Sequence, residues 1–259
     1  MKIRKKTPPI SSVNIVLPKR WSELTDKQLL YYYFLKAERY TEVAIQGFCF
    51  FRWAGIEIIE RLKEGVSVKM KIEGKKESFI MHYEDVQFGV NALSFLSEET
   101  PSEVIQVEQL GPYKAVNKYL QQVPFKDYLV CENNYQGYIH TKEEKYIENL
   151  ARLLYRKKTS SGKSVQPTSM FLNEVELLAV MGWWFSFKLF ISRKFSALFT
   201  KEEGSVVDVE AAMNGQIRAL TGGDATKEKE VFELDTWRAL TELNEKAREV
   251  SEIKQRYGK

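Results

Sequence analysis

Cysteine and histidine are scarce in this chain of 259 residues, which holds two of each. The two cysteines, Cys49 and Cys131, cannot build a disulfide framework, and their apolar surroundings predict reduced, buried thiols. His82 lies in the stretch HYED, but no second ligand follows it at the spacing of a metal-binding helix. Cys131 and His140 are residue types of a cysteine nucleophile, yet no pattern brings them together. We therefore expect no metal, no cofactor and no catalytic residues.

Long hydrophobic runs and a strong net charge are also missing. The longest apolar run, LLAVMGWWFSF at 177–187, has 11 residues, whereas a membrane-spanning helix needs roughly 18 or more. The basic start, MKIRKKTPPISS, is followed by no apolar stretch, so it does not have the pattern of a signal peptide. A net charge of +4 and a pI of about 8.8 are too mild to indicate a nucleic-acid binder by themselves. These absences favour a cytoplasmic protein without a membrane partner.

Apolar and aromatic residues are plentiful, at 44% and 13% of the chain, which is a globular balance. The clearest local pattern is VSVKMKI (66–72), where apolar and polar residues alternate as in a half-buried strand. EGKK then supplies a turn and SFIMHY (78–83) resumes the strand pattern. We therefore predict one β-hairpin over about 66–83 in an α+β protein that is predominantly α-helical.

Helical patterns fill most of the remaining chain. The polar stretch KKTSSGKSVQPTS suggests a linker at 157–170, which would separate a helical subdomain with the hairpin (1–156) from a helical subdomain (171–259) ending in a long terminal helix. VNIVLP (13–18) suggests a short edge strand. The predicted helices cover about 24–40, 41–54, 85–96, 112–122, 124–138, 140–158, 172–199, 207–221 and 226–257.

Two glycine motifs could hold a phosphate. KTSSGKS (158–164) resembles the end of a P-loop, but it lacks the first glycine and the preceding strand, so a basic loop is the better interpretation. In TGGDATKE (221–228), Gly222 suits a helix end, and Asp224 or Thr226 suits the cap of the next helix. We predict a helix corner there, because nearby carboxylates would repel a bound phosphate.

Two helical stretches carry more apolar surface than a single helix face requires. The stretch MGWWFSFKLFISRKF (181–195) is apolar almost all round, which is typical of a buried core helix and leaves open a surface for an apolar partner helix. The tail helix repeats apolar residues at coiled-coil spacing, so its far end either packs on its own domain or binds a partner. The candidate partner-binding residues are Trp183, Trp184, Phe187, Phe190, Leu243, Ala247 and Val250.

The best basic cluster of the sequence lies at 151–158, ARLLYRKK. Arg152 and Arg156 are four residues apart on one side of the predicted helix, and Lys157 and Lys158 follow them. Basic side chains also suit the last turn of any helix. A solvated helix end is therefore one interpretation, and contact with nucleic-acid phosphates is the other.

Three segments carry a family resemblance: WSELTDKQLLYYYFL (21–35), YLVCENNYQGYIHTKEEKYIENLARLLYR (128–156) and MNGQIRALTGGDATKEKEVFELDTWRALTELNEKAREV (213–250). They resemble a family of uncharacterised proteins encoded in phages and prophages of Bacteroidetes, found among tail and structural genes. The resemblance implies a role in virion morphogenesis, such as a chaperone for the tape-measure protein or a minor virion component. It brings no catalytic residues.

The leading hypothesis is therefore a non-enzymatic, phage-type tail assembly factor that binds helical segments of a partner. A tape-measure protein, another tail protein or a second copy of the chain could be that partner. The alternatives are a structural virion or connector component, whose location would be the virion, and a nucleic-acid-associated protein.

Overall fold

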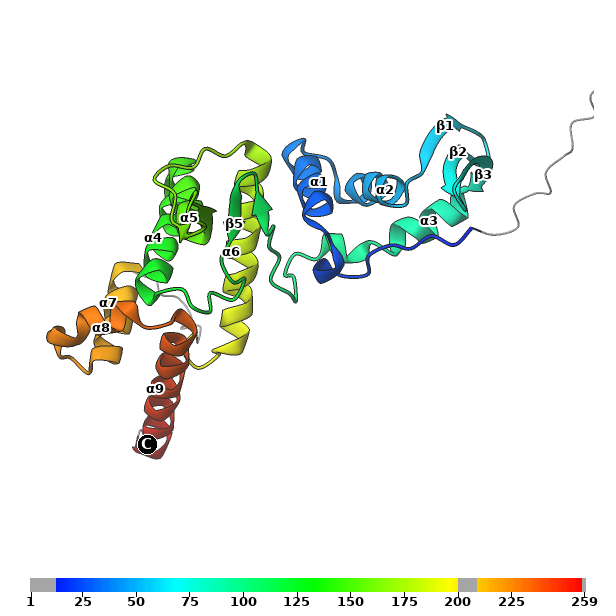
Figure 1. Cartoon of the computed structure of the whole chain (residues 1–259). Helices are drawn as coiled ribbons and strands as arrows, with labels where there is room; N and C mark the ends of the chain where they lie inside the picture. Colours follow the sequence, from blue (N-terminus) through cyan, green and yellow to red (C-terminus); the bar gives the residue numbers. More distant parts are fainter. Residues whose placement is uncertain (1–12, 200–208, 258–259) are drawn as a thin grey trace, which may run out of the picture. The chain divides into compact units, whose positions relative to one another are not determined.

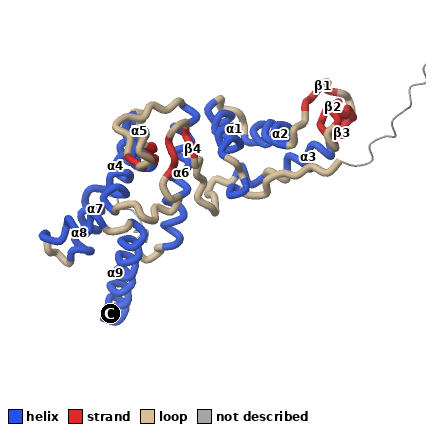
Figure 2. The backbone as a smooth tube through the Cα atoms, viewed as in Figure 1, coloured by secondary structure: helices blue, strands red, loops and turns tan. Residues whose placement is uncertain are grey.

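The computed structural model describes residues 13–199 and 209–257. Helices dominate and strands form two small sheets, which confirms the predicted helix-rich α+β class. The chain divides into two compact units, 1–99 and 100–259. Figure 2, with strands in red, shows one sheet in each unit.

The first unit contains three helices and a three-stranded antiparallel sheet in the order β1-β2-β3. Thr25 and Gln28 form a capping box at the start of α1, and the Thr41 side chain caps α2. Gly89 of α3 lies against the Phe50 ring of α2, where a Cβ would come within 2.2 Å of a ring carbon. The elements are α1 (Asp26–Ala37), α2 (Glu42–Trp53), β1 (Glu57–Arg61), β2 (Gly65–Ile72), β3 (Lys75–His82) and α3 (Tyr83–Asn91).

The predicted hairpin is present as β2 and β3, in register from Gly65 opposite His82 to Ile72 opposite Lys75. Its two-residue turn, Glu73 and Gly74, has positive φ at both positions (47° and 85°), which matches the right-handed twist of the strands. The sequence pattern did not indicate β1, the third strand. The predicted edge strand at 13–18 was also wrong, because this stretch pairs with no strand among the described residues.

The second unit is built around α6, which runs beside α5 and the second sheet (Figure 1). Its sheet is antiparallel in the order β4-β5-β6-β7. The elements are β4 (Gln109–Leu110), β5 (Tyr113–Ala115), α4 (Phe125–Thr141), α5 (Lys145–Leu154), β6 (Tyr155–Lys158), β7 (Ser164–Val165), α6 (Glu174–Lys194), α7 (Val209–Thr221), α8 (Glu228–Glu233) and α9 (Thr236–Tyr257).

The segment predicted as a linker, 157–170, contributes strand residues to this sheet. Lys157 and Lys158 on β6 pair with Val165 and Ser164 on β7, and the Thr159 N–H donates to the Lys163 carbonyl across the turn. The division into units therefore falls near residue 99 and differs from the predicted division at 157–170. The predicted helix at 112–122 was also wrong, because this stretch holds β5 and a loop.

The helix predicted over 226–257 is broken into α8 and α9. The break lies where residues 122–125 dock: the Phe125 N–H donates to the Leu234 carbonyl, and the Thr236 N–H and hydroxyl both donate to the Val123 carbonyl. Just before α8, the predicted helix corner is confirmed. Gly222 and Gly223 both have positive φ, and the Asp224 side chain accepts the Thr226 N–H at 3.0 Å.

Candidate functional site

The aromatic residues of α6 lie in the core of the second unit and not on its surface. Trp183, Trp184 and Phe187 are at most 1% exposed. The Trp183 ring meets Tyr155 edge-on at 5.6 Å, and Trp184 contacts Tyr128. These three side chains are not accessible to a partner, so their burial corrects the hypothesis that they bind one.

Phe190, the fourth candidate on α6, is half-buried. Its ring lies 4.9 Å from the ring of Tyr119 and 6.2 Å from that of Trp237 at the start of α9. The ring therefore joins α6 to its own domain, and its remaining exposure is too small for a docking surface by itself.

A polar cluster on α4 holds the middle of α6. Glu132 accepts hydrogen bonds from the Trp184 indole N–H at 3.3 Å and from the Lys188 ammonium at 2.5 Å. The Gln136 amide donates to the same carboxylate, and Lys188 lies over the Tyr135 ring. Each polar group that α6 brings into this part of the core has a partner, as burial requires. We infer a packing role for the cluster.

The two arginines of the predicted basic cluster form hydrogen bonds and an ion pair within their own unit. Arg152 donates to the Pro167 carbonyl and to Asn149. Arg156 donates to the Leu153 carbonyl at the end of α5 and forms an ion pair with Asp127 at 3.5 Å. Burial raises the pKa of the Asp127 carboxyl, and the Arg156 guanidinium opposes that rise. These contacts remove much of the cluster's free charge, although Lys157 and Lys158 are exposed.

The residue types considered for catalysis are not assembled. Cys131 and His140 lie on the same helix, α4, nine residues apart, which is about 13 Å along its axis. Cys131 is buried and His140 is exposed. Within 13–199 and 209–257, no group of three His, Cys, Asp or Glu side chains is placed to hold a metal ion.

The candidates on α9 fall along a gradient of burial. Ala239, Leu240 and Leu243 are at most 3% exposed, so the first half of the helix is docked on its unit. Ala247 is half-buried, Val250 is 52% exposed, and every described residue from 248 to 257 is exposed. The apolar repeat nevertheless continues through Val250, Ile253 and Tyr257. The second half of α9 therefore carries an apolar stripe that the described part of the chain does not cover.

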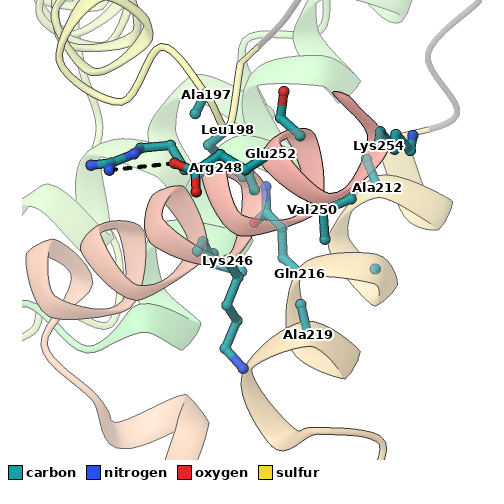
Figure 3. Close-up of a pocket in the computed structure, with 14 residues that line it drawn as sticks. Ala197, Leu198, Ala212, Gln216, Ala219, Lys246, Arg248, Val250, Glu252 and Lys254 are labelled. Atoms are coloured by element: carbon teal, nitrogen blue, oxygen red, sulfur yellow. Dashed lines mark ion pairs between the residues drawn. The ribbon is translucent and has the colours of Figure 1, made fainter. Parts of the chain in front are cut away.

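A groove lies beside this stripe, between α9, α7 and the segment after α6 (Figure 3). Its volume is about 660 Å³. On α7 the wall consists of Gln216 and three small residues, Ala212, Gly215 and Ala219, which leave room for a neighbouring helix to approach closely. We call this site the α7–α9 groove. Its lining residues are Ala197, Leu198, Ala212, Gly215, Gln216, Ala219, Leu243, Lys246, Ala247, Arg248, Val250, Ser251, Glu252 and Lys254.

The polar groups of the α7–α9 groove give it a net positive charge. Arg248 forms ion pairs with Glu245 and Glu252 on its own helix. Lys246 and Lys254 line the groove, and neither has an ion-pair partner in the described part of the chain. They lie eight residues apart, which is about 12 Å along α9. The groove thus combines an apolar wall with two ammonium groups available to a partner's carboxylates.

One buried polar atom also borders the groove. Figure 3 shows Gln216 reaching from α7 toward α9 and Lys246 reaching from α9 toward α7. The Gln216 Oε1 atom is buried, and no hydrogen bond to it occurs among the described residues. Sequence patterns indicated the α9 half of the groove, through Leu243, Ala247 and Val250. They did not indicate the α7 half, because alanine and glycine give no hydrophobic signal.

No protein-family model matches the chain, and comparisons with curated proteins and with solved structures found no significant match. In the described residues, α6 is the one helix long and apolar enough to cross a membrane by length and composition. The core helix of a globular protein passes the same test. Here α6 is a core helix of this kind, because Trp183, Trp184 and Phe187 are buried and contact aromatic rings of α4 and β6.

Proposed function

We propose that this protein is a non-enzymatic assembly factor of a phage-type tail, acting in the cytoplasm of the host cell. It would bind a helical segment of a tail protein, such as the tape-measure protein, until assembly takes that segment over. The observation that carries the proposal is the α7–α9 groove beside the uncovered stripe of α9. The resemblance of residues 21–35, 128–156 and 213–250 to phage and prophage proteins supports the choice of a tail partner.

The expected ligand is an amphipathic helix with an acidic flank. Its apolar residues would pack on Ala247 and Val250 and against the small side chains of α7, which is helix-in-groove recognition. Carboxylates seven or eight residues apart would reach Lys246 and Lys254, which supply the charge complementarity. Donation of a hydrogen bond to Gln216 would satisfy its buried oxygen.

Co-purification tests this proposal. The tagged protein is expressed together with a phage tape-measure protein, and the amount of captured partner is compared among variants. We expect Val250→Asp to reduce capture at least about tenfold, because a carboxylate would be desolvated in the apolar interface. Val165→Asp is the matched control, since Val165 is a similarly exposed valine (41%) on β7 of the same unit. It should capture as the parent does.

Three outcomes count against the proposal. Equal capture by both variants would move the binding surface away from the groove. Absence of any capture, with the tape-measure protein no more soluble in co-expression, would refute the assembly-factor function. Retention of the protein in finished particles would make it a virion component.

A further inference from the structure

Strand β3 forms one edge of the sheet in the first unit, and only β2 pairs with it among the described residues. The two-residue turn makes Ile72 and Lys75 a hydrogen-bonded pair, and such pairs alternate along the ladder. The backbone N–H and C=O groups of Lys76, Ser78 and Ile80 therefore point away from β2. No other segment that the structure describes forms a hydrogen bond with them. This free edge can accept a further strand.

A cavity of about 760 Å³ lies at the free edge of β3. Phe79 and Met81 project to the inner face of the sheet, which also holds the buried Val68. Ile80 and His82 project to the outer face, yet all four residues of β3 line the cavity. A cavity that meets both faces of a strand lies at its edge, and β2 occupies the other edge. We call this space the edge cavity.

The edge cavity is lined mainly by apolar residues. Phe50 of α2 and Phe88 of α3 line it, and residues 13–19 form a further wall. Phe88 is 80% exposed and Ile80 is 46% exposed. A strand added at the free edge would remove this apolar surface from water, which favours its binding. The volume lies within the range of roughly 300–1,000 Å³ that ligand cavities occupy.

We propose that the free edge of β3 binds an extended peptide segment of another protein, which adds to the sheet as a fourth, antiparallel strand. Its backbone pairs with the N–H and C=O groups of Ser78 and Ile80. Its side chains opposite Phe79 and Met81 project to the inner face and fill the edge cavity beside Phe50. The backbone bonds give affinity, and the cavity selects large apolar side chains.

Charge at the turn end of β3 selects an acidic residue in the peptide. On the outer face, Lys76 lies directly opposite Lys71, and neither forms an ion pair in the described part of the chain. The acids of this face, Glu57 and Glu60, lie on β1, two strands or about 10 Å from β3. Glu77 projects to the inner face, and the acid of the turn lies past the last ladder pair. A carboxylate opposite Lys76 would therefore meet a locally positive surface.

The register then fixes the sequence pattern of the peptide. In an antiparallel strand, the residues opposite Phe79 and Met81 come three and five positions before the residue opposite Lys76. The expected ligand thus has large apolar residues three and five positions before an aspartate or glutamate. The inference is independent of the α7–α9 groove, which belongs to the other unit and binds a helix in the proposed function.

Fluorescence anisotropy with a labelled peptide tests the inference on the full chain. The probe is Thr-Val-Thr-Leu-Thr-Lys-Glu with blocked ends, which places Val opposite Met81, Leu opposite Phe79 and Glu opposite Lys76. Ile80→Pro removes an N–H of the free edge and should weaken binding at least about tenfold, because the ring also blocks the added strand. Ile80→Val keeps the N–H and should bind as the parent does. Lys76→Glu should weaken binding about fivefold, and a probe ending in Lys should recover it.

The matched control is made in the probe. In the proposed register, the third residue exchanges hydrogen bonds with Ile80, whereas the N–H of the fourth residue points away from β3. N-methylation of the third residue should weaken binding at least about tenfold, because a hydrogen bond is lost and the methyl group keeps the strands apart. N-methylation of the fourth residue should leave most of the affinity.

Circular dichroism melting of each variant checks that the hairpin still folds, and the two N-methylated probes decide the question if Ile80→Pro does not fold. No binding of the parent probe, or equal weakening by the two N-methyl groups, would overturn the inference. Self-association of the chain that Ile80→Pro abolishes, without binding of the probe, would overturn it in favour of a second copy at the free edge.

Discussion

The two long helices of the second unit have almost the same length but opposite relations to solvent. In α6, 21 residues long, the aromatic side chains are enclosed and the flanking polar groups are paired. In α9, 22 residues long, the docked face ends at Leu243, although the apolar repeat continues to Tyr257. The less hydrophobic of the two helices is therefore the one that exposes a usable apolar surface.

The difference shows which sequence signal points to a binding surface. A helix that is apolar on all sides would expose apolar surface to water, which is unfavourable, so the rest of the domain surrounds it. A helix with one apolar stripe and one charged side is stable when only part of the stripe is covered. Continuation of the stripe beyond the supporting elements, at Val250 and Ile253, is therefore the more informative pattern.

Thiol reactivity would give the largest contrast between the enclosed and the uncovered regions. Burial raises the pKa of Cys131 well above its usual range and that of Cys49 to about 12. Both thiols should stay protonated at pH 8 and react with Ellman's reagent only when the chain opens. A cysteine introduced by Ser251→Cys on α9 should react at least roughly 10³-fold faster, because it needs no unfolding.

The pH dependence of the rates sharpens this test. From pH 7 to pH 8, the exposed thiol of Ser251→Cys should speed up several-fold, because its pKa is expected near the ordinary value of about 8.5. The buried thiols should stay slow at both pH values, because they react only after the chain opens, and they should react at once in guanidinium chloride. The same raised pKa values make stability fall as pH rises above about 9, because the unfolded chain then loses thiol protons that the folded chain keeps. Rapid reaction of native Cys131 would contradict the enclosed core.

Truncation of the α6 core should have the largest effect on stability. Trp184→Ala removes a fully buried ring that contacts Tyr128 and Phe187 and donates to Glu132. We expect the free energy of unfolding, measured by urea titration, to fall by about 3–5 kcal/mol. A loss below about 1 kcal/mol would mean that Trp184 is accessible, and it would restore α6 as a candidate binding surface.

The Glu132 cluster should have an intermediate effect. Glu132→Gln keeps the shape but removes the charge that faces the Lys188 ammonium. The expected loss is about 1–3 kcal/mol, because Lys188 is then left partly buried without its anion. Adding Lys188→Met should recover part of the loss, which a double-mutant cycle in urea would measure. If the loss in the double variant equals the sum of the losses in Glu132→Gln and Lys188→Met alone, the pair is not coupled.

Local patterns predicted the elements that local forces determine. The hairpin was predictable because period-two alternation and a two-residue turn agree within eighteen residues. The Gly222–Asp224 corner was predictable because caps act over three or four residues. The strands β4 and β5 were not, since two or three residues are too short to show a period. The break before α9 was also hidden, because it depends on Val123, more than one hundred residues away.

The candidate site was predictable only in part, for the same reason. The α9 stripe is a local repeat, so Leu243, Ala247 and Val250 could be identified from the sequence. The opposite wall of the groove requires knowing that α7 lies beside α9. The basic cluster was overestimated because Asp127, which pairs with Arg156, lies 29 residues earlier in the chain.

The smallest stability effect is expected at the far end of α9, and it is the one that separates binding from folding. Val250→Ser should change the free energy of unfolding by no more than about 0.5 kcal/mol, because the side chain is 52% exposed and makes few contacts that unfolding would break. Leu243→Ala, two turns earlier on the same stripe, should cost about 2–5 kcal/mol, because Leu243 is buried. Both are measured by urea titration.

If Val250→Ser weakens partner capture and leaves stability unchanged, the second half of α9 contributes to binding and not to folding. If both substitutions destabilise the protein equally, the whole helix is docked, and the groove has no uncovered stripe to offer a partner.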